Sequence, residues 1–260
     1  MKFSLMIPTR KRKEMLKTLL LSIYNTATEK HQVETLVTYD NDDTITINAL
    51  PELKEVCKNY PVKFFSRERH YSINNAYYND MARKASGDYL IAVNDDTVFT
   101  KNAWDVLTYN KLEEYLKDKP DRIVYGVTED FEVEKSRNET NYFSCFPLLS
   151  KEVVRVMRFF FDPIFHKDTA DWDLVMTYKE LNRILNLRNE IEITHISYRS
   201  GRRPQDLLDS DVMPLPGHQP SAGRNTKRNV AHLREYISNY ENIYKKNLQA
   251  IYSHPTRTWY

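Results

Sequence analysis

Residues 85–96 read Ala-Ser-Gly-Asp-Tyr-Leu-Ile-Ala-Val-Asn-Asp-Asp, and this stretch decides the fold. The short apolar run Tyr89–Val93 is typical of a buried strand. A helical pattern that begins at Ser72, a good N-cap residue, stops at Gly87 just before this strand. The Asn-Asp-Asp sequence follows the strand directly. Ligands of open α/β sheets bind beyond the carboxyl ends of the strands, so this acidic strand end indicates a functional site.

The same alternation of apolar runs and helical patterns covers the first half of the chain. Apolar runs at 3–7, 33–39 and 62–65 predict three further strands, and residues 50–60 predict a helix between two of them. Such a strand–helix rhythm builds an open, mostly parallel, twisted sheet flanked by helices. We therefore expect an α/β fold. The strand at 33–39 also ends in acid, because residues 40–43 read Asp-Asn-Asp-Asp.

The second half is less regular, and its composition changes near residue 200. The apolar patterns predict helices at 104–116, 151–157, 171–187 and 230–251, and strands at 123–128, 142–146 and 191–196. Residues 201–223 hold three of the five glycines and four prolines, which predicts a long loop of the kind that often acts as a lid. We expect one catalytic domain over 1–198, with the loop and final helix of 199–260 packed on it.

Composition excludes several classes of protein. The chain has 260 residues, with 38 Lys and Arg against 36 Asp and Glu, so its net charge of +2 argues against a protein that mainly coats nucleic acid or membrane. No Gly-rich phosphate loop of the Rossmann or P-loop type is present. The two cysteines, Cys57 and Cys145, are expected to be free thiols. No apolar run is long enough for a membrane helix or a signal peptide, so we expect a cytoplasmic protein.

The adjacent carboxylates Asp95 and Asp96 are the sharpest chemical feature. Two neighbouring carboxylates at a buried strand end repel each other and need a cation or a hydroxyl-rich ligand. A divalent ion held by one or two carboxylates and by substrate phosphates meets that need. The structural alternative is a solvated turn that caps the segment 97–107.

Three segments together resemble the family 2 glycosyltransferases, which have the GT-A fold. Residues 3–12 read Phe-Ser-Leu-Met-Ile-Pro-Thr-Arg-Lys-Arg, residues 39–44 form an acidic strand end, and residues 85–96 match the run that leads to the family's Asp-x-Asp motif. The resemblance is good over residues 3 to about 100, weaker over 140–196 and absent beyond 200. It implies transfer of a sugar from a nucleotide-diphosphate donor, a UDP-sugar foremost, to a hydroxyl acceptor with inversion.

The resemblance also implies a donor site. Thr9 and Asp40 match positions that contact the nucleobase, and Asp95 matches the ribose contact. Further nucleotide contacts are implied at Arg67 or Arg69, which follow the third strand, and at Asn79.

A metal site is implied at Asp96, which would hold Mn²⁺ or Mg²⁺. Asn94 replaces the first acid of the motif, which weakens the case for a metal, although one carboxylate and the diphosphate can still hold a divalent ion. Enzymes of this type often complete the metal shell with a late histidine, and His195 or His218 fits that position. The structural alternative for His195 is an ordinary satisfied imidazole.

The catalytic base is implied by residues 170–174, Ala-Asp-Trp-Asp-Leu, which resemble a segment in which an Asp deprotonates the acceptor. An inverting transfer needs one such carboxylate within hydrogen-bond reach of the acceptor. We predict that Asp171 is this base, with Asp168 and Asp173 as alternatives, and that Trp172 lies near the acceptor. The structural alternative is that these acids only complement a helix dipole.

The segment 199–234 is basic, with seven Lys or Arg against three Asp. It suits a lid that neutralises the leaving diphosphate, a contact patch for a phosphate-bearing acceptor such as DNA, or a solvated surface. The acceptor is predicted to be a glycan or small molecule, with a base in viral DNA as the minority hypothesis. Two alternatives to a glycosyltransferase stay open, a nucleotidyltransferase and a non-catalytic scaffold that binds nucleotide-sugar or glycan.

Overall fold

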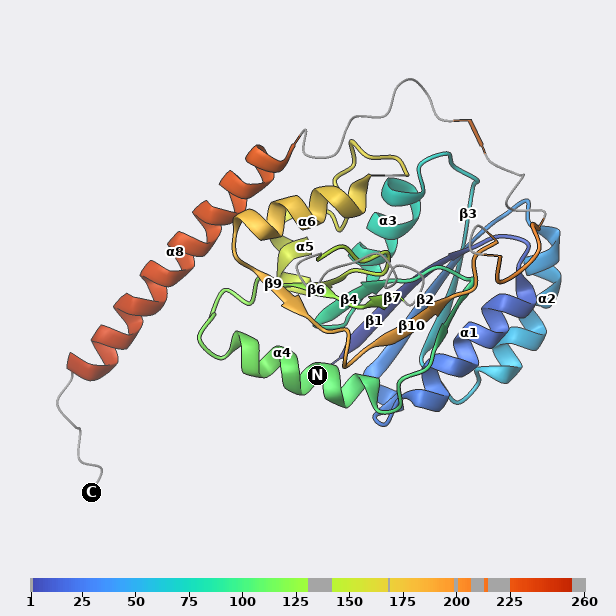
Figure 1. Cartoon of the computed structure of the whole chain (residues 1–260), viewed down its shortest axis with the longest axis horizontal. Coiled ribbons are helices and arrows are strands. Elements are labelled where there is room, and N and C mark those ends of the chain that lie inside the picture. Colours follow the sequence, from blue (N-terminus) through green and yellow to red (C-terminus); the bar gives the residue numbers. More distant parts are fainter. Residues whose placement is uncertain are drawn as a thin grey trace.

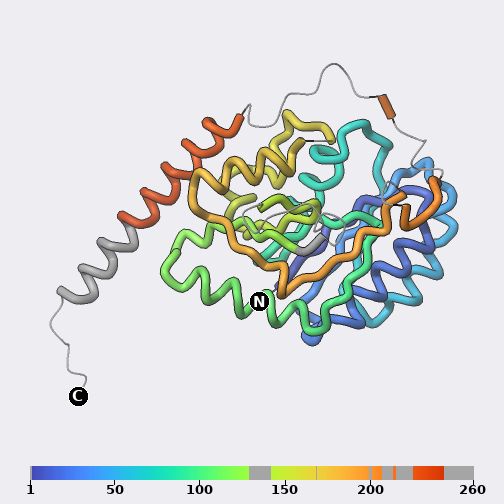
Figure 2. The backbone as a smooth tube through the Cα atoms, in the orientation of Figure 1, coloured from blue at the N-terminus to red at the C-terminus, as the bar shows by residue number. Residues whose placement is uncertain are grey.

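The computed structural model describes residues 2–130, 142–167, 169–198, 201–206, 213–214 and 225–253. Within these residues the chain forms one layered α/β body, from which the last helix projects (Figure 1). The backbone tube shows the same arrangement, with the coloured part of the last helix leading away from the sheet (Figure 2).

The main sheet has seven strands among the described residues, in the order β3-β2-β1-β4-β8-β6-β9. Only β8 runs antiparallel to its neighbours, so the predicted mostly parallel α/β fold is confirmed. The strands are β1 (Phe3–Thr9), β2 (Val33–Asp40), β3 (Val62–Arg67), β4 (Tyr89–Ala92), β6 (Tyr125–Val127), β8 (Leu148–Ser150) and β9 (Ile184–Asn186).

A second, smaller sheet lies beside the end of β4. Its described strands are ordered β5-β10-β7, and they are β5 (Thr97–Phe99), β7 (Glu129–Asp130) and β10 (Glu192–His195). Strand β10 is antiparallel to β5, and His195 pairs with Thr97. Because β5 follows Asp96 directly, this register brings residue 195 back to the acidic end of β4.

Helices cover both faces of the main sheet (Figure 1). Successive side chains of β1 point to opposite faces of the sheet, as the two-residue period of a strand requires. Leu5 belongs to the hydrophobic core on one face and Met6 to the core on the other. One face carries α1 (Lys13–Thr26), α2 (Thr44–Val56) and α4 (Trp104–Leu116), and the other carries η2 (Asn74–Tyr78), α3 (Asn79–Lys84), α5 (Lys151–Met157) and α6 (Ala170–Glu180).

The last helix, α8 (Thr226–Ser253), packs its first turns against α5 and α6. Leu233 is fully buried there and Val230 is 4% exposed. The predicted helix at 230–251 therefore exists and begins four residues earlier. No described helix is long and apolar enough to cross a membrane.

Three predicted boundaries are corrected by the structure. The helix expected at 50–60 begins at Thr44, because the Asp43 carboxylate caps it by accepting from the Thr46 N–H. The strand expected at 142–146 is absent, and β8 forms instead after Pro147, whose carbonyl accepts from β4. The helix expected at 171–187 ends at Glu180, because Asn182 adopts a left-handed conformation, with φ of 51°, that stops a helix.

Candidate functional site

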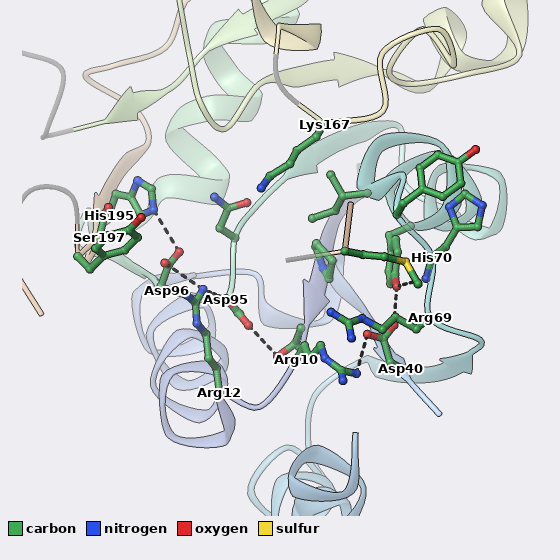
Figure 3. A pocket seen from close by; sticks show the side chains of 18 of the residues that line it. Arg10, Arg12, Asp40, Arg69, His70, Asp95, Asp96, Lys167, His195 and Ser197 are labelled. Carbon is green, nitrogen blue, oxygen red and sulfur yellow. Dashed lines mark hydrogen bonds and ion pairs between the residues drawn. The ribbon is translucent and has the colours of Figure 1, made fainter. Parts of the chain in front are cut away.

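A pocket of about 380 Å³ lies at the carboxyl ends of the parallel strands (Figure 3). Its lining comes from the ends of β1, β2 and β4, from the segment after β3, and from the segment that follows β10. Of the residues predicted for the site, the lining includes Thr9, Asp40, Arg69, Asp95, Asp96 and His195. The strand-end acids therefore meet in one cavity, as the open-sheet rule requires.

One end of the pocket is built around Asp40, the last residue of β2. Its carboxylate is 3% exposed and accepts from the Tyr77 hydroxyl and, at 3.0 Å, from Nη1 of Arg10. Burial raises the pKa of Asp40 above its ordinary value, although Tyr77 and Arg10 oppose this shift. Arg69 lies beside Asp40 on the pocket wall (Figure 3). This end offers both a carboxylate acceptor and guanidinium donors.

The other end is built around the acids that follow β4. Oδ2 of Asp95 accepts from the Thr9 hydroxyl at 2.9 Å, which ties the end of β4 to the end of β1, the strand between β4 and β2. Nη1 of Arg12 lies 2.9 Å from Oδ1 of Asp95 and 3.1 Å from Oδ2 of Asp96. Arg203 adds a second guanidinium, with Nη2 at 3.3 Å from Oδ2 of Asp96.

The two acids differ in their ionisation. Burial raises the pKa of Asp95, and the neighbouring Asp96 raises it further, against the opposing effect of Arg12. Burial also opposes ionisation of Asp96, but His195, Arg12 and Arg203 outweigh it and lower its pKa. The pKa of Asp96 is therefore the lower of the two.

His195 and Asp96 together have the donor set for a divalent cation. Nε2 of His195 lies 3.1 Å from Oδ1 of Asp96, and this oxygen is buried and receives no hydrogen bond of good geometry from the part of the chain that the structure describes. Carboxylate oxygen and imidazole nitrogen both bind Mn²⁺. The described residues contain no cluster of three or more His, Cys, Asp or Glu side chains able to hold a metal. The pair thus fits an ion whose other ligands come from substrate phosphates.

Two residues predicted to contact the nucleotide do not line the pocket. The Asn79 side chain is 1% exposed, donates to the Phe161 carbonyl and accepts from the N–H groups of Phe160 and Phe161. Arg67 donates to the Ala76 carbonyl and lies over the Tyr77 ring. In this structure both side chains hold neighbouring segments in place.

The acids proposed as base have separate surroundings. Asp171 is half-buried in the first turn of α6, and its Oδ1 accepts from the Trp172 N–H. Asp173 is 2% exposed and accepts from Thr226 and Asn229 at the start of α8, so it anchors that helix. Asp168 lies outside the described residues.

The remaining predictions concern Trp172, in the first turn of α6, and the basic segment 199–234. Trp172 is 42% exposed and packs on the Phe143 ring, which leaves its other face accessible. Much of the segment 199–234 lies outside the described residues, His218 included. Its described part brings Arg203 to the acidic end of the pocket, where Asp206 contacts that guanidinium.

Several pocket residues were not assigned a role from the sequence. Arg10 and Arg12 stand in the quoted opening stretch, yet nothing local shows that their side chains turn back toward the strand ends. Lys167 extends into the pocket from the segment before α6 (Figure 3). The sequence does not distinguish Tyr77 from an aromatic residue that only packs in the hydrophobic core. The arginines could have been inferred from the acids, because buried carboxylates without a neighbouring cation are strongly destabilising.

The sequence of the chain is similar to one known protein family. The profile of the family described as glycosyl transferase family 2 matches residues 4–194. No curated protein is significantly similar in sequence.

Solved structures share the fold. Residues 1–349 of TarS from S. aureus, in complex with UDP, superimpose with a TM-score of 0.55 at 15% identity, over 75% of this chain and 60% of that fragment. The mannosyltransferase PcManGT from Pyrobaculum calidifontis, in complex with GDP-Man and Mn²⁺, gives 0.57 at 12% identity, over 75% and 56%. GalNAc-T7 with UDP, GalNAc and Mn²⁺ gives 0.57 at 14%, over 75% and 43%. The predicted GT-A fold is confirmed. This chain spans about 60% of the TarS 1–349 fragment and smaller shares of the other two chains.

Proposed function

Because the chain belongs to glycosyl transferase family 2, we propose that it transfers a sugar from a nucleoside-diphosphate donor to a hydroxyl acceptor. The observation that supports the proposal is a single pocket with acidic side chains at both ends. Asp40 lines one end, and Asp95 and Asp96 line the other (Figure 3). A nucleotide-sugar has a base at one end and a charged diphosphate further along, so it matches a pocket with these two polar ends.

The donor site is proposed from the residues that line the pocket. Asp40 lies where the base would be held, with Arg69 beside it, and Thr9 lines the pocket between Asp40 and Asp95 as a further contact for the nucleoside. Asp95 faces the ribose in this proposal. Solved relatives contain UDP or GDP-Man, and we propose a UDP-sugar as the first donor to test.

The chemical step is a single inverting displacement. The acceptor oxygen forms a bond to the anomeric carbon of the sugar, while the bond from that carbon to the diphosphate oxygen breaks and its electron pair leaves with the diphosphate. The acceptor proton passes to a carboxylate, and we assign this role to Asp171. Its place in the first turn of α6, four residues after the pocket residue Lys167, supports the assignment.

A divalent ion fits the pair Asp96 and His195, as the 3.1 Å separation of their ligand atoms indicates. When bound there, Mn²⁺ or Mg²⁺ would supply positive charge against the diphosphate. Arg12 and Arg203 hold the second oxygen of Asp96 and keep that carboxylate ionised.

The test is nucleotide binding followed by turnover. UDP, GDP, CDP and dTDP are each added with and without Mn²⁺, and the melting temperature is measured, since a ligand that binds only the folded state stabilises it. The matching nucleotide-sugar is then incubated with hydroxyl acceptors, and released nucleoside diphosphate is measured. Stabilisation by one nucleotide together with its release from the sugar donor is the expected result.

A matched pair of variants assigns the signal to the pocket. Asp95→Asn should lose the stabilisation, while Asp80→Asn, on the exposed face of α3, should keep it. Binding without release would identify a scaffold, and no binding to any of the four nucleotides would contradict the proposed function. Duplex DNA is included among the acceptors, because transfer to a base would name the acceptor class.

A further inference from the structure

Asp206 is a third carboxylate near the pocket's acidic end, and it contacts two buried arginines that line the pocket, Arg12 and Arg203. Oδ2 of Asp206 is 2.8 Å from Nε of Arg12, and Oδ1 is 3.3 Å from Nη2 of the same guanidinium. Oδ2 also lies 3.4 Å from Nη1 of Arg203. The carboxylate therefore binds one guanidinium with both of its oxygens and contacts the second.

The edge of Arg12 that faces Asp206 is the edge suited to an anionic ligand. Nη1 of Arg12 is committed to Asp95 and Asp96, whereas Nε and Nη2 point to Asp206. The guanidinium fork binds carboxylate and phosphate in the same two-point manner. A phosphate oxygen pair can thus replace the Asp206 carboxylate on Arg12 without any change in the Arg12 contacts to the strand-end acids.

Burial distinguishes Asp206 from the other partners of these arginines. The side chains of Arg12 and Arg203 are 9% and 6% exposed, and those of Asp95 and Asp96 are 4% and 7% exposed. Asp206 is 26% exposed, so it is the most accessible member of the group. It also comes from a loop after β10, while Asp95 and Asp96 are held at the end of a central strand.

Charge adds a reason for exchange. Among these five groups the carboxylates outnumber the guanidiniums, three to two. Their formal net charge is −1 with Asp206 in place and zero once Asp206 has left, so an incoming anion meets less repulsion after Asp206 leaves.

From these contacts we propose that Arg12 and Arg203 form a binding site for the diphosphate of the donor, and that Asp206 occupies this site in the free protein. The inference rests on the proposed function for the identity of the ligand, although the anion site itself does not. Donor binding then requires Asp206 to leave the two arginines. The measured association constant is the intrinsic one multiplied by the fraction of molecules in which Asp206 has left.

The test measures anion binding to the full chain in the presence of EDTA, with inorganic pyrophosphate and UDP as probes in calorimetric titrations. Asp206→Asn and Asp206→Ala are expected to bind pyrophosphate about tenfold more tightly than the wild type, because the competing charge is gone. Asp206→Glu keeps the charge and should stay near the wild-type affinity. Arg203→Gln should bind more weakly.

Asp42→Asn is the matched control, since Asp42 is a carboxylate paired with a different pocket arginine, Arg10. Its pyrophosphate affinity should stay within about twofold of the wild type, because the lost charge is more exposed and does not contact Arg12. Melting temperatures without ligand show whether each variant folds. If Asp206→Asn folds but binds pyrophosphate equally or less tightly than the wild type, or if Asp42→Asn gains as much affinity, the inference is overturned.

The outcomes separate this inference from the proposed function. Tighter pyrophosphate binding by Asp206→Asn, together with no nucleotide binding and no sugar transfer, would support the anion site and contradict the proposed function. Sugar transfer by the wild type with unchanged pyrophosphate affinity in Asp206→Asn would support the function and overturn the role of Asp206. If Asp206→Asn fails to fold, Asp206→Ala and Asp206→Glu provide the same comparison of charge.

Discussion

Nε2 of His195 lies 3.1 Å from Oδ1 of Asp96, although the two residues are almost one hundred positions apart in the chain. The contact arises because β10 pairs with β5 and the Ile196 N–H donates to the Asp96 carbonyl at 2.7 Å. The backbone thus holds an imidazole against a strand-end carboxylate. Two ligand types that suit a divalent ion meet at one edge of the pocket.

The first prediction follows from this contact. Asp96→Asn and His195→Ala should each weaken nucleoside-diphosphate binding in Mn²⁺ by at least about tenfold, since each removes one ligand of the proposed ion. The double variant should be little worse than either single one, because the two ligands act through the same ion. Titrations with and without Mn²⁺ check this. An equal loss of affinity in EDTA would mean that the pair does not act through a metal.

The second prediction separates two acids of α6. Asp171→Asn should leave nucleotide affinity nearly unchanged and lower sugar transfer by about 10²–10⁴-fold, the usual contribution of a general base. Asp173→Asn instead gives the Thr226 hydroxyl and the Asn229 amide, which donate to Asp173, a neutral and weaker partner. It should destabilise the fold by about 1–3 kcal/mol, because buried donors lose a charged partner.

Initial rates and thermal unfolding of both variants test this assignment. Normal transfer by Asp171→Asn would remove it from the base role. The Asp173 variant controls for disturbance of α6, since the two residues share the first turn of that helix.

The third prediction concerns Gly87 at the start of β4. A Cβ added here would lie 2.5 Å from the Ser4 hydroxyl oxygen and 2.8 Å from two backbone atoms of the first strand region, the Lys2 carbonyl and the Ser4 nitrogen. Since backbone atoms cannot move aside cheaply, Gly87→Ala should destabilise the protein by about 3 kcal/mol. Chemical denaturation measures the change. Gly126→Ala is the comparison, because a Cβ there would meet only side-chain atoms, of Leu187 at 2.6 Å and of Leu148 at 3.1 Å, and should cost less stability. An unchanged midpoint for Gly87→Ala would contradict the predicted clash.

The fourth prediction is a pH dependence of stability that arises from Glu34. This carboxylate is 1% exposed and accepts hydrogen bonds from Ser4, Ser86 and Lys63. Burial alone would raise its pKa, but these donors outweigh burial and lower the pKa from 4.5 to about 2. A carboxylate with a lowered pKa contributes stability above its ordinary pKa, and this contribution is lost as the pH falls toward 2.

The shift corresponds to about 3 kcal/mol at neutral pH. Glu34→Gln should therefore be less stable than the wild type at pH 7, and the difference should shrink between about pH 4.5 and pH 2. Unfolding free energies across that range provide the measurement. Glu55→Gln, at an exposed site on α2, should show no comparable change, and a constant wild-type-to-variant gap would contradict the linkage.

Much of the fold could be predicted because its signals are local. The first four strands and the helix α4 follow from apolar runs and helical spacing, and each lies within one or two residues of its predicted bounds. Boundaries were wrong where a single residue set the backbone. Asn182 ends α6 by its left-handed conformation, and no apolar pattern marks such a stop.

The sequence by itself determined where the acids stand, because Asp40, Asp95 and Asp96 each follow an apolar strand. Parallel strands place their carboxyl ends at one edge of a sheet, so these residues had to meet. The tertiary structure alone decided what faces them. Arg12 and Asp206 are joined across 194 positions, and such a pair depends on the packing of loops after β1 and β10 rather than on any local pattern. Side chains that neutralise one another across the fold leave no periodic trace in the chain.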